Sequence, residues 1–583
     1  MGAQWLLKLL LAGSLQATVT AASASASVKL HWAPCASNTA LDCATLTVPL
    51  EYADPDNGAL AHVPIAKYNA TVPKSQRKGS LLTNPGGPGS SGIDFLANGA
   101  GEGISNVTGG FYDIVSWDPR GVGDARPLLQ CWDTAGEEYA ASDSVSAAAE
   151  IEYSLFRNQS YMPDFYNAIA EYDASVAEIA VACAEHNSSA LYTSSAAYTV
   201  RDMAAIADVL QGRENATLNY WGFSYGTILG AEFVQTFPER VGRVVFDGVF
   251  DPEANAKPYT SQLPHDEVSV KDAIDDLVTF CADAGIDGCA LNQGSRNSSV
   301  ADLRSRIAKL QASLYESPIE VSDGTWSVTV GMFSFFMYSF LKLPTTWPAV
   351  ASAVSDLETG DPDLFASLLT DATTSTVNES APDTGSMAGW PLQCNDNAPS
   401  NHTNLTNVAR QILDISLMEE TPWLNADLST LSFCRNFPNT RPRVQNLGAS
   451  RLINGETNDI LTSRNTSVLI VNALHDAATP VSSAHTLHNW LPTSSQLVMR
   501  RGPGHTTISL GSLGLVQTIR DYFLDGVVPP SREVHDLSQV VFPPGVDATS
   551  TTPNPVFNGT YGEAERMLLD ATYQTLLAFL SLP

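Results

Sequence analysis

The sequence has few basic residues for its length. It contains 31 Lys and Arg against 62 Asp and Glu, a formal net charge of −31. Nucleic acids and anionic membranes bind proteins through clusters of basic side chains. We therefore expect neither a nucleic acid nor a membrane as partner. The acidic residues are dispersed along the chain, and we attribute them to solubility in an acidic medium rather than to capture of cationic substrates.

Two other patterns are also missing. After Ala26, no segment reaches the roughly 18 uninterrupted apolar residues that a membrane-spanning helix needs. Neither Cys-x-x-Cys nor His-x-x-x-His spacing occurs, although zinc sites are commonly built from such pairs. We therefore expect no transmembrane helix, no metal and no cofactor.

The amino terminus is typical of a secretory signal peptide. Lys8 precedes a short apolar run that ends at Leu15, and small residues continue to Ala26. This pattern predicts cleavage between Ala21 and Ala26, and we assign residues 1–24 to the signal peptide. The protein is expected to be secreted and extracellular.

Eight cysteines and eleven Asn-x-Ser/Thr sequons fit an exported glycoprotein. Proximity in the sequence favours the disulfide pairs Cys35 with Cys43, Cys131 with Cys183, Cys281 with Cys289, and Cys394 with Cys434. The candidate glycosylation sites are Asn69, Asn106, Asn158, Asn187, Asn215, Asn297, Asn378, Asn401, Asn404, Asn465 and Asn558.

The most informative motif is Gly222-Phe223-Ser224-Tyr225-Gly226. The apolar run 218–221 before it predicts a buried strand, and residues 225–233 after it predict a helix packed through small side chains. A serine on a sharp strand-to-helix turn is held exposed, and glycines flank it because larger side chains would collide there. The motif therefore predicts Ser224 as a nucleophile.

Two later strands end in residues that suit an acid and a base. The β-branched run 467–472 predicts a buried parallel strand followed by Asp476, and residues 496–499 predict another, followed by His505. Ser, Asp, His is the order of the triad in α/β-hydrolases. We expect His505 to act as general base and Asp476 to orient its imidazole.

Asp247 and Asp251 are rival candidates for the acid, because they follow the predicted strand 243–247. A triad acid can sit on this preceding strand. The spacing between Asp476 and His505 decides in favour of Asp476.

A glycine-rich turn, Asn84-Pro85-Gly86-Gly87-Pro88-Gly89, follows the predicted strand 80–83. Such a turn lets backbone N–H groups point at a developing oxyanion. Pro88 has no N–H, so we expect the donors to be Gly87 and Tyr225. The alternatives are an ordinary Pro/Gly turn or a phosphate-binding loop, and the phosphate loop is disfavoured because no Gly-Lys-Ser/Thr follows. Another turn, Asp118-Pro119-Arg120-Gly121-Val122-Gly123, follows the predicted strand 112–117, and we expect Asp118 and Arg120 to have a structural role there.

These motifs together resemble the secreted tripeptidyl aminopeptidases, serine exopeptidases of the α/β-hydrolase fold related to proline iminopeptidases. The resemblance runs from about Trp32 to Val527 and includes a TAP-like segment around 440–527. It implies an α/β-hydrolase fold, with a mostly parallel, doubly wound sheet and an inserted, mainly helical cap. It also implies release of short peptides, most often tripeptides, from free amino termini. The motifs that carry it are residues 84–89, 117–123, 222–227, 246–252, 476–480 and 504–505.

The spacing of the triad predicts the domain boundaries. Between Ser224 and Asp476 lie 251 residues, more than a bare hydrolase sheet needs. We assign residues 25–255 to the first part of the core and 256–437 to the helical cap. Residues 438–583 form the second, TAP-like part, with a C-terminal helix over 564–580 that packs on the core.

Substrate recognition is predicted less directly. In the resembling family a Cys-x-Asp segment precedes the TAP-like part, and here it is Cys394-Asn395-Asp396. The resemblance makes Asp396 a candidate for binding the substrate α-ammonium group, and a structural turn cap is the alternative.

The expected partner is a peptide substrate, and the expected state is a monomer. An esterase or acyltransferase acting on a small metabolite is the alternative enzyme, and a catalytically dead binding protein is a third hypothesis.

Overall fold

The structure is a computed structural model. It describes residues 29–149, 162–255, 257, 263–292, 298–321, 324, 326–373, 380–381, 383, 385–397, 404–410, 433–437, 455–545 and 554–582. The signal peptide assigned to residues 1–24 lies outside this range, as do the sequon asparagines Asn158, Asn297, Asn378 and Asn401.

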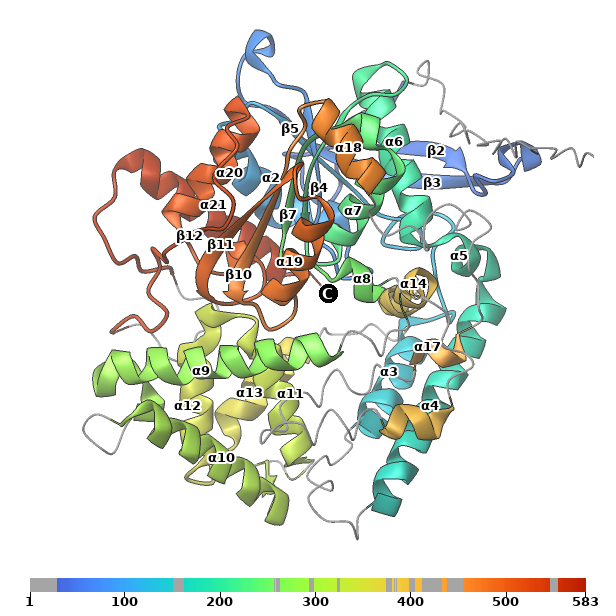
Figure 1. Ribbon diagram of the computed structural model, residues 1–583. Helices are drawn as coiled ribbons and strands as arrows, with labels where there is room; N and C mark the ends of the chain where they lie inside the picture. The colour runs from blue at the N-terminus through green and yellow to red at the C-terminus, as the bar shows by residue number, and fades with distance from the viewer. Residues whose placement is uncertain are drawn as a thin grey trace, which may run out of the picture.

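The centre of the molecule is a ten-stranded sheet with the order β1-β2-β3-β5-β4-β6-β7-β10-β11-β12 (Figure 1). The pairs from β5 to β12 are parallel, and β1, β2 and β3 form an antiparallel edge. The bounds are β1 Ala33–Pro34, β2 Asp42–Pro49, β3 Leu60–Tyr68, β4 Ser80–Asn84, β5 Asp113–Trp117, β6 Leu218–Phe223, β7 Val241–Asp247, β10 Val468–His475, β11 Ser495–Pro503 and β12 Glu533–His535.

The pattern of burial follows from the strand pairing. The central strand β10 is buried along Val468–Ala473, because helices cover both faces of the parallel sheet. Its side chains alternate between the faces: Val468 and Ile470 join one apolar cluster, and Leu469 and Val471 join the other. Strand β2, next to the edge strand β1, instead alternates buried and exposed residues over Ala44–Val48.

Helices pack on both faces of the sheet, as the sequence predicted. One face is covered by α6 Ala196–Gln211, α7 Gly226–Thr236 and α19 Val481–Trp490. The other is covered by α1 Gly92–Phe95, α2 Gly101–Val107, α20 Leu513–Asp525 and the C-terminal α21 Glu563–Leu580. Helix α21 packs so closely on α2 that a Cβ at Gly103 would lie 2.9 Å from the carbonyl oxygen of Ala571.

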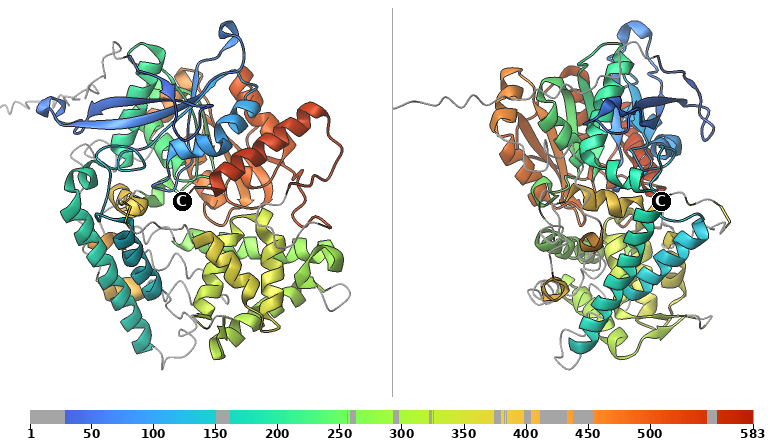
Figure 2. Two further views of the ribbon diagram at one scale, coloured as in Figure 1. Left: turned by 180° about the vertical axis from the view of Figure 1, so that it is seen from behind. Right: turned by 90° about the vertical axis from the view of Figure 1, so that its right-hand side faces the viewer.

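Apart from α8 Pro252–Asn255 and α18 Gly455–Ser463, the remaining α-helices form two lobes, which Figures 1 and 2 show on the same side of the sheet. The α9–α13 lobe consists of α9 Leu263–Gly288, α10 Val300–Glu316, α11 Val330–Leu341, α12 Trp347–Leu357 and α13 Asp363–Thr373, with the short hairpin of β8 Ile319–Glu320 and β9 Ser327–Val328. The α3–α4 lobe consists of α3 Ala135–Ala149, α4 Met162–His186, α5 Ser188–Thr193, α14 Gly389–Asp396 and α17 Phe433–Asn436.

The second lobe does not follow the sequence-based division at residue 255. Its helices α3, α4 and α5 come from the range assigned to the core, yet they pack with α14 and α17 from the range assigned to the cap. The apolar spacing of α4 predicts a helix with one buried face, but spacing does not specify which partner covers that face.

Four disulfides join Cys35 to Cys43, Cys131 to Cys183, Cys281 to Cys289 and Cys394 to Cys434, the same pairs that proximity favoured. Among the described sequons, five asparagines are exposed (Asn69, Asn215, Asn404, Asn465 and Asn558), and Asn106 and Asn187 are partly buried. In the part of the chain that the structure describes, no helix is both long enough and apolar enough to span a membrane.

Candidate active site

Ser224 lies on the turn between β6 and α7. Its φ of 53° is in the left-handed region, which non-glycine residues rarely occupy, and its N–H donates to the Asp247 carbonyl at 3.0 Å. A Cβ at Gly222 would lie 2.6 Å from the Gly226 carbonyl oxygen, and a Cβ at Gly226 would lie 2.6 Å from that of Asn84. The turn can form only because both flanking residues are glycines.

Asp476 and His505 meet beyond the ends of two neighbouring strands, β10 and β11. The imidazole Nδ1 lies 3.0 Å from one carboxylate oxygen of Asp476 and 3.2 Å from the other. Asp476 is fully buried and His505 is 9% exposed. A carboxylate at this distance fixes the tautomer and orientation of the ring, so that Nε2 is free to accept a proton.

The Asp476 carboxylate is surrounded by hydrogen-bond donors. The N–H groups of Ala478, Thr479 and Thr506 and the hydroxyl of Thr479 donate to it at 2.8–2.9 Å. Burial alone would raise the pKa of Asp476, but His505 and these donors outweigh it and lower the pKa below its usual value. The Thr479 Oγ1 also lies 3.2 Å from His505 Nδ1. Asp476 is therefore held as an anion at the imidazole.

The rival acids make other contacts. The Asp247 carboxylate accepts from the Thr507 N–H at 2.6 Å and from the Thr507 hydroxyl at 2.7 Å, and burial raises its pKa to about 6. The Asp251 carboxylate accepts from the N–H groups of Glu253 and Ala254 at the start of α8 Pro252–Asn255. Asp476 is the carboxylate that contacts His505.

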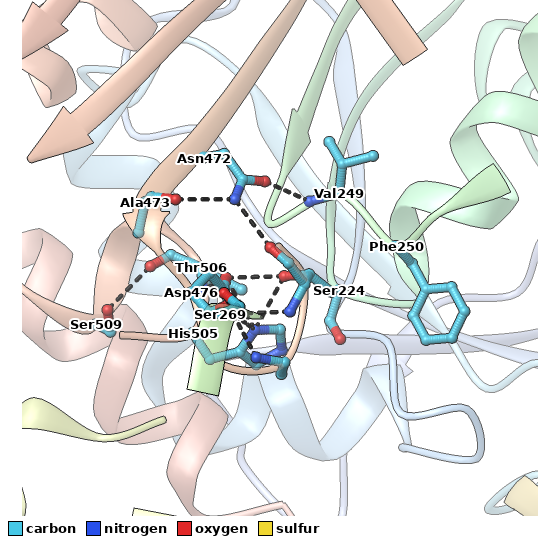
Figure 3. A network of polar contacts seen from close by, with 12 residues as sticks. Ser224, Val249, Phe250, Ser269, Asn472, Ala473, Asp476, His505, Thr506 and Ser509 are labelled. Atoms are coloured by element: carbon cyan, nitrogen blue, oxygen red, sulfur yellow. Dashed lines mark hydrogen bonds and ion pairs between the residues drawn. The ribbon is translucent and has the colours of Figure 1, made fainter. Parts of the chain in front are cut away.

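Figure 3 shows Ser224 beside His505, Asp476 and Thr506. Within the described residues no hydrogen bond joins Ser224 to His505. Hydrogen bonds between catalytic groups are often long in the absence of substrate and tighten in the complex. The structure thus brings the three residues to one site, with the acid and base in contact and the serine not yet bonded to the base.

The glycine-rich turn lies directly against the nucleophile. A Cβ at Gly86 would lie 2.9 Å from the Tyr225 nitrogen and 3.0 Å from Ser224 Cβ. The Gly86 N–H donates to the Asn84 side chain at 3.0 Å, so this amide is occupied. Gly87 and Tyr225 stay the candidate oxyanion donors that the sequence predicts.

The Asp118–Asp124 turn supports this arrangement. Asp118 accepts from the Ser91 hydroxyl at 2.7 Å and from the N–H groups of Ile93 and Asp124, and burial raises its pKa to about 6. Arg120 is buried against Asp202, with its Nε 2.7 Å from the carboxylate. These contacts fix the segment that follows the glycine-rich turn, in the structural role expected for Asp118 and Arg120.

Asp396 ends α14 beside the nucleophile elbow. One carboxylate oxygen accepts from the Ala196 N–H at 2.8 Å, at the start of α6, and the other accepts from the Tyr225 hydroxyl. Burial raises the pKa of Asp396 to about 7, although both hydrogen bonds lower it. Asp396 is therefore close to the elbow, and it also caps a helix, which was the alternative structural interpretation.

Sequence reasoning missed two residues near the site. Burial and the nearby Asp396 raise the pKa of Glu232 to about 8, although Arg201 lowers it. Glu232 is the one charged residue of α7, and this isolation was a signal in the sequence. Phe579 of α21 lies against His505, with ring centroids 5.8 Å apart, and no local pattern predicts that contact.

Comparisons with known proteins agree with this geometry. The model of the alpha/beta hydrolase fold matches residues 79–268, and the model of the TAP-like protein family matches residues 438–535. Tripeptidyl aminopeptidase of Streptomyces lividans is 26% identical over 511 residues, covering 87% of this chain and 86% of that protein. Serine protease Hip1 of Mycobacterium tuberculosis is 25% identical over 524 residues, covering 86% and 90%. Carboxylesterase B of Mycobacterium tuberculosis is 26% identical over 505 residues, covering 84% and 85%.

The sheet order, the helices on both faces and the family match make this chain an enzyme with the α/β-hydrolase fold. Over most of its length it is similar to a tripeptidyl aminopeptidase and to a serine protease, and residues 438–535 match the TAP-like model. The fold and the family resemblance inferred from the sequence motifs are confirmed.

Proposed function

We propose that this protein is a secreted serine peptidase that releases short peptides, mainly tripeptides, from the free amino termini of peptide substrates. The observation that supports it most is the contact of buried Asp476 with His505 at 3.0 Å, beside a serine on a strained strand-to-helix turn. The likeness over most of the chain to a tripeptidyl aminopeptidase supports the exopeptidase activity.

The chemistry follows from the roles of these groups. The Ser224 hydroxyl attacks the scissile carbonyl and passes its proton to His505 Nε2, while Asp476 stabilises the imidazolium. The N–H groups of Gly87 and Tyr225 bind the oxyanion of the tetrahedral intermediate. His505 then protonates the leaving amine, which departs and leaves an acyl-enzyme. Water activated by His505 hydrolyses the ester and frees Ser224.

Asp396 and Glu232 are the groups that we assign to the substrate amino terminus. Their pKa values, about 7 and about 8, show that burial disfavours the charged form of both carboxyl groups. An α-ammonium group placed between them would favour the charged forms, which is the basis for recognising a free amino terminus. Asp396 also bonds the Tyr225 hydroxyl, so recognition and the oxyanion site share one residue.

The structural features of the chain outside the site support an exported protein. All eight cysteines are in disulfides, which persist in oxidising compartments. We propose a signal peptide over residues 1–24 and glycans on the exposed asparagines of the sequons.

The test uses matched peptides, one with a free amino terminus and one N-acetylated, followed by mass spectrometry with Ser224→Ala as control. We expect cleavage of the free peptide only, in steps of three residues, and a loss of several orders of magnitude in Ser224→Ala. Retained turnover in Ser224→Ala would contradict the proposed role of Ser224 as nucleophile. Equal cleavage of both peptides would contradict the exopeptidase activity.

A second candidate function is an esterase acting on a small molecule, because the similar protein named carboxylesterase B matches at comparable identity and coverage. The same triad would hydrolyse an ester without using Asp396 or Glu232. Rapid turnover of an aryl ester with no cleavage of either peptide would favour this function.

A further inference from the structure

The α9–α13 lobe contacts the segments that carry both the acid and the base. The Ser269 hydroxyl of α9 donates to the backbone carbonyl of Asp476. The His505 N–H donates to the carbonyl of Lys342, at the end of α11, at 2.8 Å. Next to the acid, Asp276 of α9 pairs with His475, whose Nδ1 lies 2.7 Å from the Asp276 carboxylate.

Helix α9 makes these contacts with one face. Ser269, Asp272, Asp276 and Phe280 are separated by three or four positions, so their side chains lie along one stripe of the helix. The last of these side chains, Phe280, lies near β11: a Cβ at Gly502 would lie 3.9 Å from its ring. The lobe therefore rests on the ends of both strands that lead to the acid and the base.

His475 links these parts through its backbone as well as its side chain. It precedes Asp476, and its carbonyl accepts from the Gly504 N–H at 3.3 Å, in the residue before His505. Its side chain is 36% exposed and that of Asp276 is 18% exposed. A shift of His475 would therefore move the turn of the acid and the turn of the base together.

The charged groups that face His475 come from two elements. Asp276 and Asp272 of α9 favour the imidazolium, and Arg500 of β11 opposes it. The hydrogen bond that His475 donates to Asp276 is the largest influence and raises the pKa of His475, against burial, which lowers it. The pair is a charged hydrogen bond below this raised pKa and a weaker, neutral–anion contact above it.

We propose that Asp276 is a positioning residue for the reaction, which holds the Asp476 and His505 turns in register by pairing with protonated His475. The proposal rests on the proposed triad. It assigns to the α9–α13 lobe a part in catalysis other than covering the substrate. The pair needs His475 charged, so it weakens as the pH rises through the raised pKa of His475.

The test measures kcat and KM against pH for Asp276→Asn, with Asp275→Asn as matched control. Asp275 is the neighbouring residue and pairs with Arg304 inside the lobe, so its replacement removes the same charge away from His475. We expect kcat of Asp276→Asn to fall about tenfold, the change for one pKa unit of lost interaction. KM should stay within about twofold, and the alkaline fall of kcat that comes from breaking the pair should disappear, because the variant has no charged pair to lose. Asp275→Asn should match the wild type.

His475→Gln tests the same contact from the sheet side, in case Asp276→Asn does not fold. The double variant should be no slower than the slower single variant, because both remove one interaction. A wild-type pH profile in Asp276→Asn, or additive losses in the double variant, would overturn the proposal. If either of these outcomes is found while Ser224→Ala is inactive in the same assay, the proposed function still holds and only the role of Asp276 is contradicted.

Discussion

The two helical lobes differ in how they are held together. The helices of the α9–α13 lobe come from one stretch of the chain, and their disulfide, Cys281–Cys289, spans 8 residues. They surround a large apolar cluster that also includes Phe165 and Ile169 of α4. The α3–α4 lobe is assembled from separate stretches around a smaller cluster. Its two disulfides span 52 and 40 residues, and Arg435 of α17 pairs with Asp173 of α4. A lobe made of distant segments must offset more chain entropy, and covalent links do so where apolar burial is small.

The lobes also contact different parts of the site. The α9–α13 lobe bonds the turns of Asp476 and His505. The α3–α4 lobe bonds the Tyr225 hydroxyl through Asp396, and a Cβ at Gly389 would lie 2.5 Å from the Pro88 carbonyl oxygen in the glycine-rich turn. One lobe is thus tied to the proposed acid and base, and the other to the proposed oxyanion donor Tyr225 and to Asp396, which we propose binds the substrate amino terminus.

The first prediction removes the long covalent link of the α3–α4 lobe. Replacing Cys394 and Cys434 by Ser is expected to lower the free energy of unfolding by about 4 kcal/mol, because a link across 40 residues restricts the unfolded chain strongly. Removing Cys281–Cys289, which spans 8 residues, should cost only about 2.5 kcal/mol. Denaturant unfolding of both double variants checks the difference. Equal losses would contradict the contrast between the lobes.

The second prediction concerns Gly86, where the absence of a side chain lets the glycine-rich turn lie against the nucleophile. In Gly86→Ala the new Cβ would lie 2.9 Å from the Tyr225 nitrogen, so kcat should fall by about 10²- to 10³-fold, as for loss of an oxyanion donor. Gly79→Ala is the control, since its φ of 100° is close to the 103° of Gly86 and its Cβ has no neighbour within 4 Å. It should lose stability but keep kcat. A parallel fall in both variants would point to backbone strain instead.

The sequence predicted the elements that local patterns define. The strands before Ser224, Asp476 and His505 are buried apolar runs with a parallel-sheet pattern, and the structure contains them as β6, β10 and β11. The glycines at positions 222 and 226 indicated close backbone approach, and the structure has it. These features were predictable because each depends on a few consecutive residues.

What the sequence could not predict depends on contacts between distant segments. The packing of α4 against α17 joins residues more than 200 positions apart, and the apolar face of a helix does not specify which segment covers it. The same holds for His475 with Asp276 and for His505 with Phe579. Asp396 was found only through a family resemblance, because a lone buried carboxylate has no sequence pattern of its own.

The third prediction asks whether Asp396 binds substrate or only caps α6. Its pKa of about 7 means that the carboxylate is charged above that pH and neutral below it, so kcat/KM for a peptide with a free amino terminus should fall as the pH drops through 7. In Asp396→Asn the fall at acid pH should become smaller, and kcat/KM at pH 8 should fall about thirtyfold, for roughly 2 kcal/mol of lost charge pairing. Turnover of a neutral aryl ester by the same variant is the control, because it needs Ser224 and His505 but no ammonium group. If ester and peptide turnover fall together, Asp396 acts through the Tyr225 contact and the helix cap. If only peptide turnover falls, the α3–α4 lobe carries the recognition of the amino terminus.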